Sequence, residues 1–206
     1  MSQAAAETDR RGTILAIAAE LFAANGVAST SVREIGNRAG MLSGSLYYHF
    51  GSKDEMVQEI ILSYLTELTQ RYDAIRSAEH EPIRALDEIV RASLQVIANH
   101  PYATEIYQND AAYLARLPRG REVEAATERV PETWLSVIEQ GVVAGVFRDD
   151  IPPRIFYNLF RDALWRSVLW FDPQGERTRE DLADDMLSVF FNGFAAPHGG
   201  TELEST

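Results

Sequence analysis

Cysteine is absent from this chain of 206 residues. Its absence excludes disulfide scaffolds, thiolate metal sites and cysteine catalysis, and it fits a reducing cytoplasm, where we expect the protein to be. Long hydrophobic runs are absent too. No stretch approaches the ~20 apolar residues that span a bilayer, and the N-terminus lacks the apolar segment of a secretory signal. We therefore expect a protein that makes no contact with a membrane.

Signatures of catalysis and metal binding are also missing. The four histidines show no metal-ligand spacing, and the chain has no glycine-rich phosphate loop and no GxSxG motif. Carboxylate pairs such as Asp184-Asp185 are typical of solvated helix faces. We therefore expect no enzyme activity, no bound metal and no cofactor.

The chain does have the material for a core, and its charge is uneven. Hydrophobic residues make up 46% and charged residues 24% of the sequence, which is typical of a folded globular protein. The formal net charge is −12, yet residues 1–53 hold five basic and four acidic side chains, whereas residues 54–206 hold 14 and 27. Because DNA repels an acidic body, any function on nucleic acid has to lie within residues 1–53.

Apolar residues recur every three to four positions, and glycine and proline fall between these periodic segments, which predicts an all-α fold. Ser31 with Glu34, and Ser52 with Glu55, have capping-box spacing at the starts of two helices, and Ser43 is placed to cap a helix between them. The expected helices lie at about 10–25, 31–39, 43–50, 53–77, 82–99, 101–116, 134–143, 154–171 and 179–196.

Two of these helices are short, are joined by a turn and lie between longer ones, which is the helix-turn-helix arrangement. We therefore expect a helix-turn-helix DNA-binding domain of three helices at residues 1–52. A helical effector-binding and dimerisation domain is expected at residues 53–196, and a disordered tail at residues 197–206.

The second short helix is the candidate recognition helix, of a size that fits the major groove. Leu46 and Phe50 are four residues apart and can face the core, which leaves small and hydrogen-bonding residues outside. Lys53 follows at the N-terminus of the next helix, where backbone N–H groups favour an anion. The predicted DNA-contacting residues are Ser31, Arg33, Ser43, Gly44, Ser45, Tyr47, Tyr48, His49 and Lys53. Capping alone can explain Ser31 and packing can explain Tyr47, so DNA binding is predicted by the ordered combination.

In this combination the chain resembles the TetR family of transcriptional regulators. The resemblance covers roughly residues 10–60 and is carried by Ala18, Leu21, Phe22, Gly26, Thr30-Ser31-Val32-Arg33-Glu34-Ile35, Gly40, Gly44-Ser45-Leu46-Tyr47-Tyr48-His49-Phe50, Ser52, Lys53, Glu55 and Met56. It implies a homodimer with one recognition helix per subunit in successive major grooves of a near-palindromic operator, contacted through Ser31, Ser45, Tyr47, His49 and Lys53. It also implies repression that ends when a small molecule binds the C-terminal domain.

The later helices predict a dimer interface. Residues 155–171 are apolar on nearly every side, so one side can face the chain's own domain and another a second subunit. The last helix adds a second apolar face, and together they suggest a four-helix interface with two helices from each subunit. The predicted interface residues are Phe156, Phe160, Met186, Phe190 and Gly193. The alternative is that both helices belong to one monomeric core.

A pocket for the effector is predicted on the same apolar helix. Tyr157, Arg161 and Trp165 are spaced by four and share a stripe, and an arginine there needs an anion, a carbonyl or an aromatic ring as partner. Asp162 has the i, i+4 spacing for an ion pair with Arg166, which leaves Arg161 free for the effector. The predicted ligand-binding residues are Tyr107, Gln108, Trp134, Tyr157, Arg161 and Trp165. Core packing is the alternative for each single aromatic residue.

The C-terminal domain also resembles actinobacterial TetR-type repressors of sterol-ring catabolism. This resemblance is carried by Ile106-Tyr107-Gln108 with Ala111, by Gln140-Gly141 with Gly145 and Phe147-Arg148, and by Phe160-Arg161-Asp162 with Trp165, Ser167-Val168 and Trp170. It implies an effector that is a CoA thioester of a bicyclic steroid fragment, held by Arg161 and Trp165. Because Leu169 stands where a further arginine is expected, we widen the effector class to a bulky hydrophobic acyl-CoA or a related carboxylate.

The expected function is therefore that of a transcriptional repressor that binds double-stranded operator DNA as a homodimer. We expect its release by a small molecule, such as an acyl-CoA of lipid or steroid catabolism. Two alternatives come from other classes. One is an acyl-CoA enzyme, and the other is a metabolite-binding protein that does not bind DNA.

Overall fold

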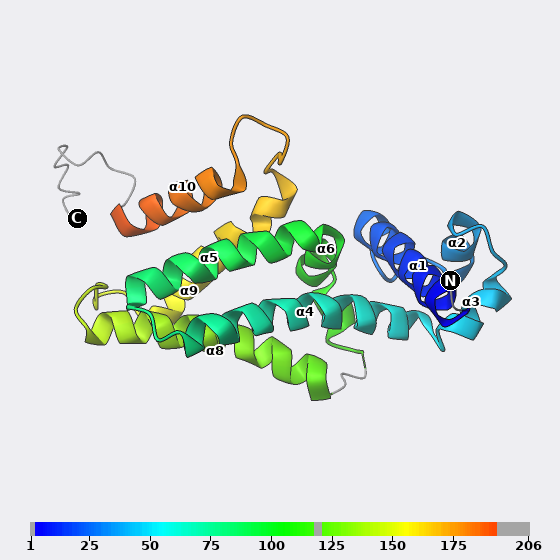
Figure 1. Ribbon diagram of the computed structural model, residues 1–206, viewed down its shortest axis with the longest axis horizontal. Helices are drawn as coiled ribbons and strands as arrows, with labels where there is room; N and C mark the ends of the chain where they lie inside the picture. The colour runs from blue at the N-terminus through cyan, green and yellow to red at the C-terminus, as the bar shows by residue number, and fades with distance from the viewer. Residues whose placement is uncertain (1–2, 118–120, 193–206) are drawn as a thin grey trace.

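The computed structural model describes residues 3–117 and 121–192, and within them the chain is helical and has no strand. Figure 1 shows a small helical head at one end, a long helix leading out of it, and a larger helical body. The elements are α1 (Gln3–Asn25), α2 (Val32–Arg38), α3 (Ser43–His49), α4 (Lys53–Ser77), α5 (Pro82–Asn99), α6 (Pro101–Asn109), α7 (Ala111–Leu114), α8 (Arg121–Val143), α9 (Pro153–Arg166), the 3₁₀ turn η1 (Ser167–Leu169) and α10 (Arg179–Asn192).

The head contains the two short helices that the sequence predicts, with a sharp turn between α2 and α3. The Ser31 hydroxyl accepts a hydrogen bond from the Glu34 N–H and caps α2, and Gly40 has φ +66° where the chain turns. Gly36 of α2 is buried against this turn. A Cβ at this residue would lie 3.0 Å from the Met41 carbonyl oxygen, so glycine is what lets α2 and α3 approach each other.

Helix α4 joins the head to the body. The Ser52 hydroxyl caps its first turn by accepting from the Glu55 N–H, and the helix ends at Ser77 as predicted. Its buried residues fall on one stripe: Met56 and Val57 near the head, and then Ile60, Ile61, Tyr64, Leu65, Leu68 and Tyr72 in the body. One amphipathic helix thus contributes to the cores of both parts.

The body packs α5, α8 and α9 around the second half of α4. At its centre lies Trp134 of α8, which is fully buried. Helix α10 lies on the outside of α5 (Figure 1), where Arg91 of α5 binds Asp184 of α10 at 2.5 Å. None of the helices in the described part of the chain has the length and hydrophobicity needed to cross a membrane.

Four helix boundaries differ from the sequence prediction. Helix α1 begins at Gln3 rather than near residue 10, and α8 begins at Arg121, well before Trp134. The predicted helix at 101–116 is broken at Asp110 into α6 and α7, because Asp110 turns away to bind the head. The predicted helix at 154–171 tightens into a 3₁₀ turn after Arg166.

One predicted cap is absent, and some predictions lie beyond the described residues. Ser43 does not cap α3: it is the first residue of the helix, whose N-cap is Leu42 and lacks a side-chain hydrogen bond. The described part of α10 ends at Asn192. The predicted interface residue Gly193, the predicted end of the last helix and the predicted tail at 197–206 lie outside the described residues.

Candidate functional site

The third helix presents an outward face free of the core. Leu46 is fully buried and Phe50 is 1% exposed, so both anchor α3 as expected from their i, i+4 spacing. Tyr47 and Tyr48 are 56% and 80% exposed. Two large aromatic side chains with hydroxyl groups therefore project from the surface of a short helix and leave most of their area open to solvent.

The predicted neighbours of these tyrosines lie on the same face. Gly44 and Ser45 are exposed, and Ser43 and His49 are partly exposed. The His49 ring lies edge-on to Tyr48, with centroids 5.4 Å apart. Nothing lies within 4 Å of a Cβ added at Gly44, so packing inside the chain does not require glycine there. A glycine in open space on this face leaves room for another molecule to approach the backbone.

Helix α2 adds hydrogen-bonding and positive groups beside this face. Ser31 is exposed at the N-cap of α2, and Arg33 is exposed as the second residue of the helix. Other arginines of the head are paired, Arg11 with Glu59 and Arg38 with Glu20. Among the residues that the structure describes, Arg33 forms no ion pair, so its charge is available to an anion outside the chain.

Lys53 is placed differently from the other predicted contacts. Its ammonium group donates to the carbonyl oxygens of Val27 at 2.7 Å and Thr30 at 2.9 Å, and it lies 5.6 Å from the centre of the Tyr113 ring. These bonds direct the lysine toward the turn between α1 and α2. The structure therefore gives Lys53 a role inside the protein that its position in the motif did not indicate.

In the body, three of the predicted ligand-binding residues come together around Trp134. The Trp134 ring centre lies 6.0 Å from that of Tyr157 and 6.3 Å from that of Trp165. All three side chains are buried. The i, i+8 spacing on α9 thus does place Tyr157 and Trp165 on one face, packed against α8.

Buried hydroxyl groups on α4 and α5 satisfy these indoles. Trp134 donates to the Tyr72 hydroxyl at 2.9 Å, and that oxygen lies 2.6 Å from the Ser93 hydroxyl. Trp165 donates to the Tyr64 hydroxyl. Burial raises the pKa of both tyrosines well above its usual value, so both stay neutral donors and acceptors.

These tyrosines were not predicted as part of the site. The signal that could have identified them is the stripe Tyr64, Leu65, Leu68 and Tyr72 on α4, where phenol groups take positions that aliphatic residues normally fill. A buried phenol needs a polar partner, and the indole N–H groups of the three tryptophans in the sequence are donors that can supply one.

Arg161 lies at the edge of this aromatic cluster rather than inside it. Its side chain is 41% exposed, pairs with Asp162 at 2.8 Å and lies 5.6 Å from the centre of the Tyr157 ring. The prediction that Asp162 pairs with Arg166 is wrong, because the adjacent guanidinium takes the carboxylate. Arg161 has an aromatic partner as expected, and it keeps access to solvent.

The remaining two predicted ligand-binding residues come from α6. Tyr107 and Gln108 are both partly exposed, and the Tyr107 ring centre lies 5.9 Å from that of Tyr64. Tyr107 therefore connects the short helix next to the head with the buried cluster. No contact places Gln108 in that cluster.

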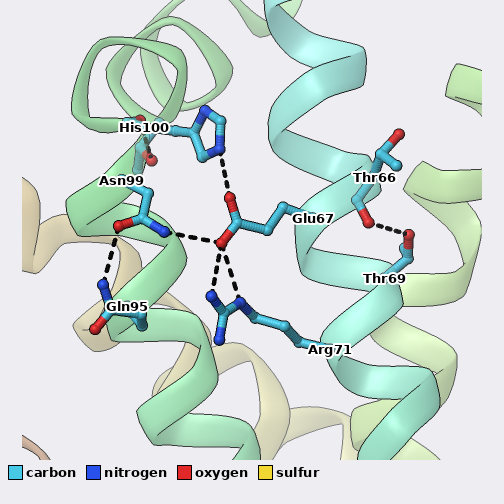
Figure 2. Close-up of polar contacts among 8 residues, drawn as sticks. Thr66, Glu67, Thr69, Arg71, Gln95, Asn99 and His100 are labelled. Carbon is cyan, nitrogen blue, oxygen red and sulfur yellow. Dashed lines mark hydrogen bonds and ion pairs between the residues drawn. The ribbon is translucent and has the colours of Figure 1, made fainter.

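A polar network lies on the surface of α4, at the place where α5 ends and α6 begins. Figure 2 shows Glu67 accepting hydrogen bonds from His100 and Asn99, both at 2.8 Å, and from Arg71. Burial alone would raise the pKa of Glu67, but the hydrogen bonds from His100, Arg71 and Asn99 outweigh it and lower the pKa below its usual value. A charged carboxylate thus ties α4 to the junction of α5 and α6.

The described residues of the predicted dimer interface are buried or partly buried within their own chain. Phe160 is fully buried in its own chain, packed on Phe190 with ring centres 4.0 Å apart and on Trp134 at 5.4 Å. Its ring has no surface left for a second subunit. Phe156 joins the same cluster at 5.7 Å from Phe190, and Met186 is 8% exposed.

A different stripe of α9 remains exposed and apolar. On α9 it consists of Ile155, Leu159 and Ala163, which are spaced by four, and it is bordered by the exposed Arg166 at the end of the helix and by the exposed Trp170 after the 3₁₀ turn. Beside it, between α9 and α10, lies a groove of about 810 Å³ whose lining is mostly apolar and includes Leu169, Met186, Val189 and Phe190. Large apolar side chains with up to 62% exposure on adjoining helices are typical of a surface that another molecule covers.

Two family descriptions match this chain. Residues 14–60 match the bacterial regulatory proteins of the tetR family, and residues 79–194 match the tetracyclin repressor-like C-terminal domain. The first match covers the helix-turn-helix and the start of α4. The second covers the body.

Named relatives match over most of their length. The HTH-type transcriptional repressor KstR2 of Mycobacterium tuberculosis (strain H37Rv) is 38% identical over 89% of this chain and 92% of its own, and KstR2 of Rhodococcus jostii RHA1 is 36% identical over 93% and 94%. The solved structure of the ketosteroid transcriptional regulator KstR2 of M. tuberculosis aligns over 89% of this chain and 94% of its own, with a TM-score of 0.82. AibR in complex with isovaleryl coenzyme A and operator DNA, 21% identical over 88% and 98%, has the same fold with a TM-score of 0.74.

Proposed function

This chain belongs to the TetR family of bacterial transcriptional regulators, and we propose that it is a ligand-responsive repressor that binds a near-palindromic operator as a homodimer. The family consists of DNA-binding regulators rather than enzymes. The observation that carries the proposal is the exposed face of α3, from which the side chains of Tyr47 and Tyr48 project with most of their surface uncovered.

Operator binding uses α3 in the major groove. Ser43, Gly44, Ser45, Tyr47, Tyr48 and His49 lie on the face that meets the bases and nearby phosphates. Ser31 and Arg33 of the adjoining helix contact phosphate, since Arg33 has no carboxylate partner in the described chain. Two heads are needed because one seven-residue helix offers few contacts to DNA.

Homodimerisation covers the exposed stripe of α9 and the groove beside α10. In a twofold interface the same patch meets itself, so Ile155, Leu159 and Trp170 are each buried twice in one dimer. Ala163, in the middle of the stripe, is small enough for two helices to approach closely. Phe156 and Phe160 support this face from beneath, and Met186 and Phe190 line the groove.

The effector is a bulky hydrophobic acyl-CoA or a related carboxylate of lipid or steroid catabolism. The resemblance to KstR2, a ketosteroid regulator, supports this class. The aromatic cluster around Trp134 offers the apolar lining for a ring system, and Arg161 at its edge offers a cation to an anionic group that stays in solvent. Because Trp134 and Trp165 are buried, the effector has to separate packed side chains to enter. Its binding is therefore coupled to a conformational change of the helical body.

The test uses Arg161→Ala, with Arg84→Ala as the control, because Arg84 is an exposed arginine of α5 that pairs with Glu88 and lies outside the aromatic cluster and the α9 stripe. Fluorescence anisotropy measures binding to DNA from upstream of the protein's own gene, before and after addition of acyl-CoA thioesters. We expect Arg161→Ala to bind this DNA as the wild type does and to need at least about tenfold more thioester for release, since it loses one charged contact. Arg84→Ala also removes one paired arginine from the surface of the body, and this variant should respond as the wild type does. An unchanged response of Arg161→Ala would reject this pocket.

A further inference from the structure

The turn between α1 and α2 is held from both sides at a single residue. The Val27 N–H donates to the carboxylate of Asp110, with both oxygens at 3.3 Å, and the Val27 carbonyl oxygen accepts from the Lys53 ammonium at 2.7 Å. Lys53 comes from the first residue of α4, and Asp110 comes from the break between α6 and α7. Elements of the head, of the connecting helix and of the body thus meet at one peptide segment.

The Asp110 side chain makes this contact instead of capping its own helix. It is the N-cap residue of α7, a position where an aspartate side chain normally accepts from the first backbone N–H groups of its own helix, yet it makes no such bond. The carboxylate instead reaches a residue 83 positions earlier in the chain. The same interaction accounts for the interruption between α6 and α7 that the helical periodicity did not predict.

Lys53 is fixed by more than one group. Besides Val27, it donates to the Thr30 carbonyl oxygen at 2.9 Å, and both of these residues are buried. The Tyr113 ring lies 5.6 Å below its ammonium, and the Tyr113 hydroxyl donates to Asp54 at 2.6 Å. The helix dipole disfavours a lysine in the first turn of a helix. The two carbonyl oxygens and the aromatic ring offset this repulsion for Lys53.

We propose that Lys53 and Asp110 are positioning residues for operator binding: together they fix the α1–α2 turn, and through it the recognition helix, while Lys53 makes no phosphate contact of its own. This assigns Lys53 a role different from the one that the family resemblance implies. The inference rests on the proposed operator binding. For variants at Lys53 and Asp110, this role predicts effects on operator binding that differ in sign or in salt dependence from those of simple electrostatics.

The first test is the salt dependence of operator binding by Lys53→Met, measured by anisotropy on DNA from upstream of the gene. We expect binding about tenfold weaker or more, because two buried carbonyl oxygens lose a charged donor, with the same slope of log K against log[salt] as the wild type. If Lys53 contacts phosphate, two contacts are lost per dimer and the slope becomes shallower by about 1.8. That shallower slope, or unchanged affinity, would overturn the proposal.

The second test compares Asp110→Ala with Asp110→Asn. Removing a negative charge should by itself strengthen binding to DNA, and it does so equally in both variants. Asparagine keeps an oxygen that accepts the Val27 N–H, whereas alanine keeps none. We therefore expect Asp110→Ala to bind the operator about tenfold more weakly and Asp110→Asn to bind at least as tightly as the wild type. Tight binding by both variants, or weak binding by both, would contradict the positioning role.

A measurement without DNA separates this inference from the proposed function. Hydrogen exchange of the Val27 amide in the free protein should be about tenfold faster in Asp110→Ala and unchanged in Asp110→Asn, with equal thermal midpoints as evidence that the fold is intact. If the wild type binds no operator DNA, the proposed function fails, and the exchange result still decides whether Asp110 holds the turn. If the wild type binds DNA and exchange is equal in all three proteins, only the positioning inference fails.

Discussion

Replacing Leu159 with alanine should weaken the dimer without unfolding the subunit. Leu159 is 60% exposed in the middle of the apolar stripe of α9. Complete burial of a leucine side chain contributes ~1.5–3 kcal/mol, so covering the exposed part contributes ~1–2 kcal/mol per copy. A twofold interface buries the residue twice, which gives ~2–4 kcal/mol per dimer and raises the dissociation constant roughly 30- to 1000-fold.

Sedimentation equilibrium over a dilution series measures this dissociation constant. Leu42→Ala is the matched control, because the same atoms are removed from a residue that is 81% exposed in the head, far along the chain from α9. It should leave the dimer unchanged. If Leu159→Ala also leaves the dissociation constant unchanged, or if Leu42→Ala raises it equally, the exposed stripe is not the interface.

Three further substitutions test other parts of the account. Tyr47→Ala, at a side chain that is 56% exposed, should raise the operator dissociation constant by roughly tenfold or more and change the urea unfolding free energy by less than ~0.5 kcal/mol; equal operator affinity would remove α3 from the DNA interface. Ser93→Ala removes the hydrogen-bond partner of the buried Tyr72 hydroxyl and should cost ~1–3 kcal/mol of unfolding free energy, whereas a loss below ~0.5 kcal/mol would contradict the buried network. Burial alone would raise the pKa of Glu67, but the hydrogen bonds from His100 and its neighbours lower it in the folded protein. The stability that Glu67 contributes is therefore present above its unfolded-state pKa, and it is lost as the pH falls through its folded-state pKa. Urea unfolding of Glu67→Gln should therefore depend less on pH than that of the wild type between about pH 5 and pH 2, and equal profiles would refute this.

The head could be predicted from the sequence because its signals are local. The caps at Ser31 and Ser52, the turn glycine at Gly40 and the spacing of Leu46 and Phe50 each act within a few residues, and the structure confirms all of them. Local hydrogen bonds and helical periodicity fix these features before any tertiary contact forms.

The body was harder because its decisive contacts join distant parts of the chain. The apolar residues of α9 surround most of the helix, so their pattern cannot tell that Phe160 faces Trp134 while Leu159 faces outward. Likewise, the break at Asp110 comes from a hydrogen bond to Val27, a contact that no helical pattern can contain.

Release of the wild-type protein from DNA tests the central claim most directly. Anisotropy would follow binding to DNA from upstream of its gene while bulky acyl-CoA thioesters and the matching free acids are added in parallel. The account predicts tight, salt-dependent binding that one thioester reverses at a concentration where coenzyme A alone has no effect. Binding that persists with every thioester and every acid would contradict the proposed effector class, and absence of binding at low salt would contradict regulation of the neighbouring promoter.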